Sequence, residues 1–526
     1  MKAILFIFLL IFSTSYHAEN TKLDFAKTDK KLYLITEKFS LIDFGAVGDG
    51  TTDDSGAFIK AITAVSKSSS KTLLIPGNFI FNLSNKTIDF AKHSNNIILQ
   101  FNGGILINGN LVGSRTRVNA QRIKIFENII LSGTFTSVTG YAYPEWFGAF
   151  PFDNRLNLVD ALRKLDPVFF DIQLGAGDYF TQDGEYLAKG LSGIAMGKSN
   201  IIWETDKSNT YLFSLGMVGG QLKNRTFDYN YIKNLTLFIT KKSRETKLKG
   251  NTGIIIGASH KPFIENVNVK QSLDYQRFNR SDLQEFISDE KKLNDANVGI
   301  EFKGDSELSI LNNITTYADV GILFSQYTDM ASVTNYINDC GPYGLANVYF
   351  TKHAVQSQSI LFNGTQSWNR GLYGFYSEDS NLWNTFRNNR FENIRIEQLT
   401  AEIVKNKKVV STSIRIGKSN LIANLIFENI ILSGASNGIF VGETASGNIF
   451  FDKVFLYPDI TIKRDFAIKT KMVPPRKSPD ETPFNIHLKN IDLYRDSPSI
   501  FENSQNSALQ RNTSQQNKFS DLIIAY

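Results

Sequence analysis

The sequence predicts an all-β chain that coils into a parallel β-helix, and three observations favour this fold. Short apolar runs follow one another along the chain, separated by Gly, Asn and Ser. The octapeptide FENIILSG occurs twice, at Phe126–Gly133 and at Phe427–Gly434. A glycine followed by apolar residues recurs at Gly299, Gly321 and Gly344, at intervals of 22 and 23 residues. That period suits a turn of three short strands and their corners, so that successive turns stack and share one interior.

Relatives of the octapeptide mark further turns of the coil. They are IKNLTLFI from Ile232, IENVNVK from Ile264, LNNITTY from Leu311, FENIRIEQL from Phe391 and LKNIDLY from Leu488. Their shared Asn suits a corner, because Asn tolerates left-handed backbone geometry and can form a ladder with the Asn of the next turn. A leucine-rich horseshoe would need a leucine consensus and a helix in each repeat, and the sequence has neither.

The stretch Leu41–Ile62, LIDFGAVGDGTTDDSGAFIKAI, joins an extended apolar run to a glycine-rich turn, two adjacent acids and a short amphipathic helix. It resembles the signature that opens the rhamnogalacturonase/epimerase-like group of the pectate-lyase-like (pectin lyase fold) superfamily. The resemblance implies a right-handed, single-stranded parallel β-helix with short N-terminal capping helices. We interpret Asp49, Asp53 and Asp54 as turn-forming and helix-capping acids rather than as metal ligands.

Four regions follow from the composition along the chain. Residues 1–18 are interpreted as a secretory signal peptide, because Lys2 precedes an apolar run of about ten residues, too short to span a membrane. Residues 19–140 are assigned to an N-terminal pectate-lyase-like module and residues 141–497 to the main parallel β-helix. Residues 498–526 form a polar C-terminal tail that ends in a short strand, LIIAY. The mature protein is therefore expected to be secreted or periplasmic.

Two features interrupt the regular turns. The segment Phe147–Leu165 is a second, divergent copy of the opening motif that lacks its GDG and paired acids, so its turn must be built differently. Trp146, just before it, is interpreted as a packing residue. The segment Ser281–Ala296 begins with a Ser-x-x-Gln capping box and predicts a helical insertion. Such an insertion either walls a binding groove or forms a surface flap.

Composition limits the partners. The chain has 57 Lys and Arg against 51 Asp and Glu, for a net charge of +6. This diffuse excess suits a polyanion, and no dense basic block indicates nucleic-acid binding. Cys340 is the single cysteine, so stability must come from a large core rather than from disulfides. No membrane span, metal site or cofactor is predicted; calcium has no supporting ligand pattern, and the oligomeric state is left open.

The segment Trp368–Glu397 is the best candidate for chemistry, because aromatic side chains alternate there with acids and arginines. Aromatic faces stack on sugar rings, and arginines bind carboxylates in a bidentate fork. Part of these aromatic residues must instead fill the interior of the coil. The candidate catalytic residues are Glu397, Asp379, Glu378, Asp319 and Asp339. The candidate substrate-binding residues are Trp368, Tyr376, Trp383, Arg387 and Arg390.

Two classes of function fit this sequence. The favoured one is a secreted carbohydrate-active enzyme, a glycoside hydrolase or polysaccharide lyase acting on an acidic, pectin-like polysaccharide. The alternative is a non-catalytic glycan-binding β-helix surface protein or tailspike-like adhesin. An enzyme should hold two carboxyl groups about 5–10 Å apart in an open groove, whereas a binder needs no such pair. Polygalacturonase and pectate-lyase motifs are missing, and the RIK at Arg122–Lys124 is interpreted as a chance match.

Overall fold

The computed structural model describes most of the chain from residue 39 onward. The described ranges are 39–93, 95–153, 157–221, 228–241, 250–271, 296–340, 344–380, 386–397, 411–434, 437–458, 468–470, 484–493, 501–502 and 517–525. The predicted signal peptide, the predicted helical insertion before Ala296, and Trp383 lie outside these ranges. No helix within them is long and apolar enough to cross a membrane.

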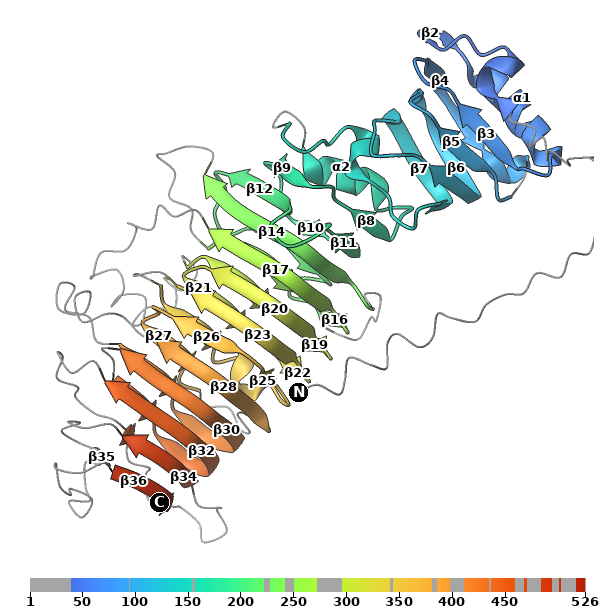
Figure 1. Ribbon diagram of the computed structural model, residues 1–526. Coiled ribbons are helices and arrows are strands. Elements are labelled where there is room, and N and C mark those ends of the chain that lie inside the picture. Colours follow the sequence, from blue (N-terminus) through green and yellow to red (C-terminus); the bar gives the residue numbers. More distant parts are fainter. Residues whose placement is uncertain are drawn as a thin grey trace, which may run out of the picture. The chain divides into compact units, whose positions relative to one another are not determined.

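The first part of the described chain is a seven-stranded parallel sheet covered by one α-helix (Figure 1). Its strands are β1 (Phe39–Ser40), β2 (Asp49–Asp53), β3 (Thr72–Ile75), β4 (Ile80–Asp89), β5 (Ile98–Phe101), β6 (Ile105–Asn119) and β7 (Phe126–Ser137). The helix is α1 (Ser55–Lys67), and a short 3-10 helix, η2 (Phe90–Lys92), follows β4. Phe58, Ala61, Ile62 and Val65 lie on one face of α1 and are completely buried, as the helical spacing predicts.

The opening motif builds its turn with acids. The predicted extended apolar run is instead a 3-10 helix, η1 (Leu41–Phe44), which ends at Gly45 with φ 88°, a conformation that suits glycine. Asp54 is buried, and its Oδ1 accepts a 2.7 Å hydrogen bond from the amide of Val47. Asp49 Oδ1 accepts from the amides of Thr51 and Thr52, and Asp53 Oδ1 from that of Ser55. The interpretation of these acids as turn-forming and capping residues is confirmed.

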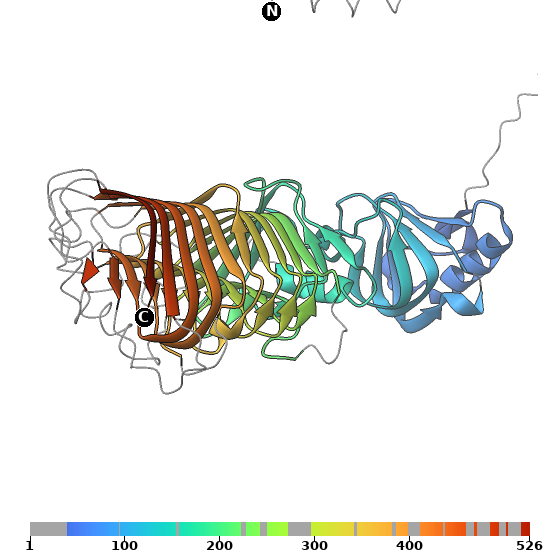
Figure 2. The ribbon, with the colours of Figure 1, turned by 90° about the horizontal axis from the view of Figure 1, so that it is seen from below.

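The rest of the chain is a right-handed parallel β-helix built from three sheets (Figure 2). The 15-stranded sheet contains β8 (Asp171–Gln173), β9 (Gly177–Thr181), β11 (Gly190–Ser192), β12 (Ser199–Thr205), β14 (Tyr231–Lys241), β17 (Phe263–Gln271), β20 (Ile310–Tyr317), β23 (Ser332–Asp339), β25 (Leu361–Asn363), β26 (Gln366–Asn369), β28 (Asn389–Glu397), β30 (Ser419–Gly434), β32 (Thr444–Pro458), β34 (Phe484–Leu493) and β36 (Asn517–Ala525). The 11-stranded sheet contains β10 (Tyr186–Leu187), β13 (Tyr211–Leu215), β15 (Thr252–Ile256), β18 (Val298–Phe302), β21 (Val320–Phe324), β24 (Ala346–Phe350), β27 (Tyr373–Ser377), β29 (Thr412–Ile416), β31 (Asn437–Val441), β33 (Ile468–Thr470) and β35 (Phe501–Glu502). The three-stranded corner sheet contains β16 (Ser259–His260), β19 (Ser306–Glu307) and β22 (Thr328–Asp329).

Each turn of the coil, called a rung here, runs from the 11-stranded sheet through a corner into the 15-stranded sheet. β18, β19 and β20 make one such rung, and β21, β22 and β23 the next. The predicted 22-residue step is confirmed by the pairing of Val298 with Val320. The predicted next step is wrong: Val320 pairs with Ala346, so the residue after it, Gly321, aligns with Asn347 rather than with Gly344.

An asparagine ladder holds one corner of the 15-stranded sheet, as the repeated Asn predicts. Its positions have φ between 52° and 77° and are Asn234, Asn266, Asn313, Asn335, Gly364, Asn393, Asn429, Lys453 and Asn490. Asn313 Nδ2 donates to Asn266 Oδ1 at 2.7 Å, and Asn429 Nδ2 donates to Asn393 Oδ1 at the same distance. A left-handed conformation costs an L-residue roughly 1–2 kcal/mol, and Asn is one of the few residues that tolerate it.

The interior of the coil is filled with stacked aromatic side chains. Phe302, Phe324 and Phe350 lie on consecutive rungs, with ring centroids 4.5 and 4.3 Å apart. The other inward column, on the 15-stranded sheet, contains Phe362, Phe391, Phe427 and Phe451. The FENIILSG strands therefore form because Phe and the following aliphatic residues alternate into this core.

The second copy of the opening motif starts the main coil. It contains the 3-10 helix η3 (Pro144–Phe147) and the helix α2 (Leu158–Leu165), and η3 ends at Gly148 with φ 87°. The conformation matches that of Gly45, and the duplication stays a prediction. The turn differs as predicted, since Asn157 caps α2 by accepting a hydrogen bond from the amide of Val159. The boundary at residues 140–141 stays a prediction.

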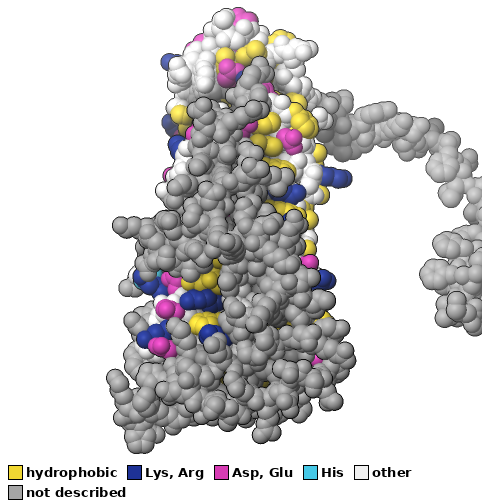
Figure 3. Space-filling model, turned by 90° about the vertical axis from the view of Figure 1, so that its left-hand side faces the viewer, with side chains coloured by type: hydrophobic (Ala, Val, Ile, Leu, Met, Phe, Trp, Pro, Cys, Tyr) yellow, Lys and Arg dark blue, Asp and Glu magenta, His cyan; other side chains and the backbone are white. Residues whose placement is uncertain are grey.

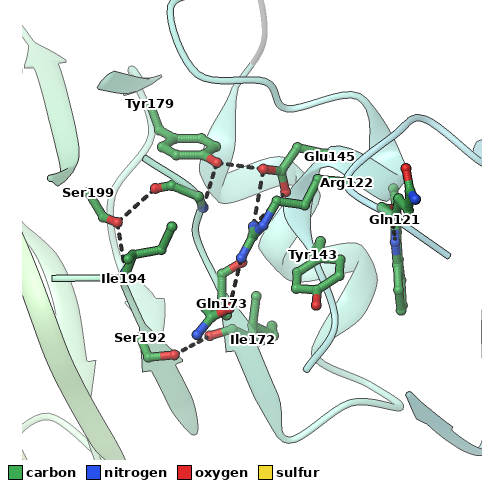
Figure 4. Close-up of polar contacts among 12 residues, drawn as sticks. Gln121, Arg122, Tyr143, Glu145, Ile172, Gln173, Tyr179, Ser192, Ile194 and Ser199 are labelled. Carbon is green, nitrogen blue, oxygen red and sulfur yellow. Dashed lines mark hydrogen bonds and ion pairs between the residues drawn. The ribbon is translucent and has the colours of Figure 1, made fainter. Parts of the chain in front are cut away.

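A buried polar network joins the loop after β6 to the start of the main coil (Figure 4). Arg122, in the loop between β6 and β7, donates from Nη1 to the carbonyl of Gln173 at 2.8 Å and to Glu145 Oε1 at 3.2 Å. Glu145 is 2% exposed and also accepts a 2.6 Å hydrogen bond from Tyr179. Trp146 is completely buried, which confirms its packing role. The network is structural, and the RIK motif contributes to it through Arg122.

The last strand, β36, ends the 15-stranded sheet. It pairs with β34 in the antiparallel direction, whereas the neighbouring pair of β32 and β34 is parallel. The predicted terminal strand LIIAY is confirmed and extends further toward the N-terminus.

Candidate functional site

A groove on the outer face of the 11-stranded sheet is the candidate site. Its volume is about 640 Å³, a size usual for ligand sites. The lining residues are Asn209, Gly250, Thr252, Ala296, Val298, Glu301, Lys303, Leu323, Ser325, Thr351, Lys352, His353 and Glu378. Carboxylates, cations and apolar side chains thus share one surface. We call it the Glu301–Glu378 groove.

The groove continues a column of outward-facing residues, one from each rung. In register along the coil these are Glu301, Leu323, Tyr349, Tyr376, Arg415 and Phe440. Strand geometry sets this column, because neighbouring strands lie about 4.8 Å apart and alternate residues point to opposite faces. Inward neighbours such as Phe302 and Phe324 belong to the main core, whereas Leu323 and Tyr349 belong to a separate outer cluster.

Glu301 is held in place by hydroxyl groups of neighbouring rungs. Ser325 Oγ donates to Glu301 Oε1 at 2.6 Å, and Thr252 Oγ1 donates to Oε2 at 3.2 Å. Lys303 Nζ lies 3.8 Å from Oε1. The residue is only 6% exposed. Glu301 is thus a fixed, charge-balanced carboxylate at the edge of the groove.

Glu378 is held by donors from the rung before its own. The hydroxyl of Tyr349 donates to Oε1 at 2.7 Å, and the amide of Lys352 donates to Oε2 at 2.7 Å. Both donors come from β24 or the residues just after it. Burial and the nearby charge of Glu378 raise the pKa of the Tyr349 hydroxyl, which therefore remains a donor at neutral pH.

Glu301 and Glu378 belong to rungs that are three steps apart along the coil. Glu301, on β18, accepts hydrogen bonds from both neighbouring rungs, whereas Glu378, after β27, accepts from the β24 rung. Thr351 Oγ1 connects the two anchors by donating to the carbonyl of Ser325 at 3.2 Å. With neighbouring strands about 4.8 Å apart, two to three rung spacings amount to roughly 10–14 Å. That is wider than the separations found in glycoside-cleaving pairs.

Aromatic and cationic side chains extend the groove along the coil. Tyr349 and Tyr376 stack with their ring centroids 4.7 Å apart, and Tyr373 packs against Tyr376 at 4.6 Å. The guanidinium of Arg415 lies 4.8 Å from the centroid of the Tyr376 ring and 5.6 Å from that of Phe440. Burial raises the pKa of both Tyr373 and Tyr376. Charged side chains of both signs lie beside hydrophobic ones on the described surface seen in Figure 3.

Of the predicted catalytic residues, only Glu378 lines the groove. Asp379 is exposed, and its Oδ1 accepts from the amide of Lys418 at 2.8 Å. Asp319 is buried and accepts from the amide of Asn297 at 2.9 Å, so its predicted catalytic role is corrected to a structural one.

The other two predicted acids lie on the 15-stranded sheet. Asp339, at the end of β23, forms an ion pair with Arg370. Glu397, at the end of β28, is exposed and lies 3.5 Å from Arg395 Nη2. The structure therefore does not bring Asp339 or Glu397 to the Glu301–Glu378 groove.

The predicted substrate-binding residues are scattered as well. Trp368 is 0% exposed and packs edge-on against Phe362 in the interior, so it cannot stack on a sugar and that expectation is corrected. Arg390, on β28, is exposed and forms ion pairs with Glu392 and Glu428. The backbone of Arg387 forms an isolated parallel β-bridge with the backbone of Gln358, beside the corner sheet. Tyr376 belongs to the outer column but is 6% exposed and lies beneath the Arg415 guanidinium, so its substrate-binding role stays a prediction.

Sequence reasoning missed Glu301, Lys303, Tyr349 and Arg415. One signal could have found Glu301: the repeat GIEF carries a charge at the third position, where the related repeats GIII and GILF carry Ile and Leu. Metal binding gains no support, since no group of three or more His, Cys, Asp or Glu in the described ranges is placed to hold an ion.

The fold and the groove together define a parallel β-helix protein with a groove that combines carboxylates, cations and apolar side chains. No protein-family model and no curated protein sequence matches the chain. Structure comparison finds the A-module of the mannuronan C-5 epimerase AlgE6 from Azotobacter vinelandii, with a TM-score of 0.29 and 11% identity over 89% of this chain and 100% of that chain.

Two further similar structures are a tailspike protein mutant of E. coli bacteriophage HK620 and PfbA, a surface adhesin of Streptococcus pneumoniae. The tailspike has a TM-score of 0.29 and 12% identity over 86% of this chain and 80% of its own. PfbA has a TM-score of 0.25 and 10% identity over 92% and 100%. Similarity at this level carries no conclusion about activity.

Proposed function

We propose that this protein is an exported carbohydrate-active enzyme that cleaves an acidic polysaccharide in the Glu301–Glu378 groove. The observation that carries the proposal is one groove lined by two carboxylates, Glu301 and Glu378, each held by protein hydrogen-bond donors. Glycosidic cleavage requires one carboxyl group to serve as acid and a second as base or nucleophile. Export follows from the predicted signal peptide at residues 1–18.

The surroundings suit two carboxylates that must hold fixed positions. Each receives at least two hydrogen bonds from the protein, which orients it before a ligand arrives. The two environments also differ. Glu301 has Lys303 as a neighbouring cation, whereas Glu378 has the neutral hydroxyl of Tyr349. Different environments are what separate the roles of two catalytic carboxyl groups.

An acidic substrate is supported by the cations beside the pair. Lys303 lines the groove, and Arg415 lies farther along the outer column over the ring of Tyr376. A guanidinium that lies over aromatic rings can still bind a carboxylate through two N–H groups. A polyuronate chain laid along the column would therefore meet cations at more than one of its units.

The second candidate is a non-catalytic glycan-binding protein, and one observation favours it. Glu301 is balanced by Lys303 and held by two hydroxyl donors. This arrangement suits a carboxylate that stays ionised and only accepts hydrogen bonds from sugar hydroxyls. The groove would then use both carboxylates for recognition and neither for proton transfer.

A panel of acidic and neutral polysaccharides separates the two candidates. Product formation is measured by new reducing ends and by the ultraviolet absorbance of unsaturated uronates, so that a lyase gives both signals and a hydrolase the first alone. For the enzyme, Glu301→Gln and Glu378→Gln should each lower turnover by about 100-fold or more while binding persists. Binding without turnover in the wild type would establish the non-catalytic function. Glu397→Gln serves as the matched control outside the groove.

A further inference from the structure

We propose that a second groove in the coil binds an anionic amphiphile, a ligand with an apolar chain and a carboxylate at one end. This corner groove lies where the three-stranded sheet leads into the 15-stranded sheet, at the starts of β14, β17, β20 and β23 (Figure 1). Its volume is about 560 Å³. Its lining residues are Tyr229, Tyr231, Lys261, Phe263, Leu308, Ser309, Ile310, Met330 and Ser332. The inference does not depend on the proposed carbohydrate function.

Two parallel columns of side chains run along the corner groove. The strand column consists of Tyr231, Phe263 and Ile310, which pair in register on successive rungs. The corner column consists of Tyr229, Lys261, Leu308 and Met330, the residues just before these strands and β23. Tyr229, Ile310 and Met330 are among the most exposed large hydrophobic residues of the described chain. Exposed apolar side chains gathered in one groove indicate a binding surface.

The backbone conformation of the corner column is a second reason to assign a function to its side chains. Its four residues all have left-handed conformations, with φ between 52° and 62°. Bulky L-residues adopt this conformation only at a cost in free energy, whereas Asn or Gly tolerates it. The Asn ladder of the same sheet shows the low-cost solution. Tyr, Lys, Leu and Met at four consecutive rungs therefore point to a role for their side chains, because strained backbone positions gather at ligand sites.

Two cations at the rim specify the charge of the ligand. Lys261 Nζ donates to the hydroxyl of Tyr229 at 3.1 Å and lies 5.0 Å from the centroid of that ring. Lys233 Nζ lies 4.7 Å from the centroid of the Tyr231 ring. Neither lysine forms an ion pair with a carboxylate of the described residues. Cations beside an apolar groove complement an anionic head group.

The polarity of the groove argues for an acyl chain over a sugar. Besides the lysine and tyrosine groups at the rim, only the serines 309 and 332 contribute side-chain hydroxyls to its lining. A sugar that moved from water into this groove would lose hydrogen bonds at most of its hydroxyl groups, and each unpaired hydroxyl costs free energy. An apolar chain loses no hydrogen bonds on entering and gains from burial.

Calorimetric titration of the full-length protein tests this proposal with three probes below their micellar concentrations. Dodecanoate should bind saturably, dodecyl maltoside should bind about tenfold more weakly because it lacks the charge, and acetate should not bind because it lacks the chain. Lys261→Gln should weaken dodecanoate binding and leave dodecyl maltoside binding unchanged. Ile431→Asn, an exposed position on β30, is the matched control and should bind as the wild type does.

The double variant Leu308→Asn/Met330→Asn gives the sharpest result. Because Asn suits the left-handed backbone, the melting temperature of the double variant should equal or exceed that of the wild type. Its affinity for dodecanoate should fall about tenfold or more. Saturable binding that survives this double variant would overturn the proposal. So would a lower melting temperature without loss of binding, which would assign these side chains a purely structural role. Absence of dodecanoate binding to the wild type would overturn it as well.

Discussion

The hydroxyl of Tyr349 donates a 2.7 Å hydrogen bond to Glu378 Oε1 across one rung of the coil. Tyr349 belongs to β24, whereas Glu378 follows β27, so the contact couples two neighbouring turns. The ring of Tyr349 packs in the outer cluster and is nearly inaccessible to water. A buried neutral donor of this kind fixes the carboxylate without neutralising it, and the groove depends on this fixation.

Tyr349→Phe removes the hydroxyl and keeps the ring. Glu378 then retains the amide of Lys352 as its donor but loses one of two hydrogen bonds. A hydrogen bond to a charged group contributes about 1.5–3 kcal/mol, so ligand affinity or kcat/KM should fall about 10- to 100-fold. Steady-state kinetics or equilibrium binding checks this. Wild-type behaviour of the variant would show that Glu378 needs no help from Tyr349.

Alkaline pH should destabilise the protein through its outer tyrosines. Burial raises the pKa of Tyr349, Tyr373 and Tyr376 above the usual value near 10. The unfolded chain therefore releases these protons at lower pH than the folded chain does. Their contribution to stability is fully present below about pH 10 and is lost as pH rises through the folded pKa values. Denaturant unfolding between about pH 8 and about pH 11, a range that includes the usual tyrosine pKa, measures the loss.

The tyrosinate absorbance provides a second readout of the same titration. Ionisation of the outer tyrosines should coincide with the loss of the β-sheet circular dichroism signal. If all tyrosines ionised while the circular dichroism signal stayed constant, the burial of these three hydroxyls would be contradicted.

Lys453→Asn should stabilise the coil. Lys453 occupies a ladder position with φ 56°, between Asn429 and Asn490. Asn relieves the left-handed strain and can restore side-chain hydrogen bonds to its neighbours, whereas the exposed ion pair to Glu428 contributes little. We expect the free energy of unfolding to rise by about 0.5–1.5 kcal/mol. Lys453→Ala, which restores no ladder, is the control. Equal stability of the two variants would contradict this account of the ladder.

The polar network around Glu145 should be sensitive to single changes. Glu145→Gln leaves Arg122 without its buried anion, and such losses cost about 3–5 kcal/mol in fully buried pairs. The Arg122 side chain is 27% exposed, so about 2–4 kcal/mol is expected here. Tyr179→Phe should cost less, about 1–2 kcal/mol. Chemical denaturation measures both, and a Glu145→Gln effect below that of Tyr179→Phe would contradict the assigned ion pair.

Gly175 packs closely against two side chains of this network. A Cβ at that position would lie 3.0 Å from the Tyr179 hydroxyl and 3.2 Å from Glu145 Oε1. Gly175→Ala should therefore destabilise the protein without removing any polar group. Its effect should largely disappear in the Tyr179→Phe background, because the nearest crowded atom is gone.

The fold was readable from the sequence because its signals are local and repeated. The Asn of each octapeptide relative sits at a left-handed corner, and Phe427 and its equivalents alternate into the core. The register was less readable: the step from Gly321 was assigned to Gly344, but insertions in the corner shift it to Asn347. Loop lengths in a coil vary freely, so a period found in one rung does not carry over to the next.

The site was less predictable than the fold. Tyr376 and Glu378 were found because aromatic and acidic residues cluster near them, yet the same clustering pointed to Trp368, which is core. Alternation along a strand gives two faces but does not say which one is outside. Glu301 lies 77 residues before Glu378 in the sequence, and only the stacking of rungs brings the two into one groove.

The most direct test of the central claim compares Glu378→Gln with Glu397→Gln on an acidic polysaccharide that the wild type binds or cleaves. Both changes replace a carboxylate by its isosteric amide, but only Glu378 lines the groove. If the protein is an enzyme, the account predicts that Glu378→Gln lowers turnover by about 100-fold. If the protein only binds, the same change should lower its affinity by about tenfold. Glu397→Gln should match the wild type. Loss of function in Glu397→Gln with an unaffected Glu378→Gln would place the site on the other sheet and contradict the account.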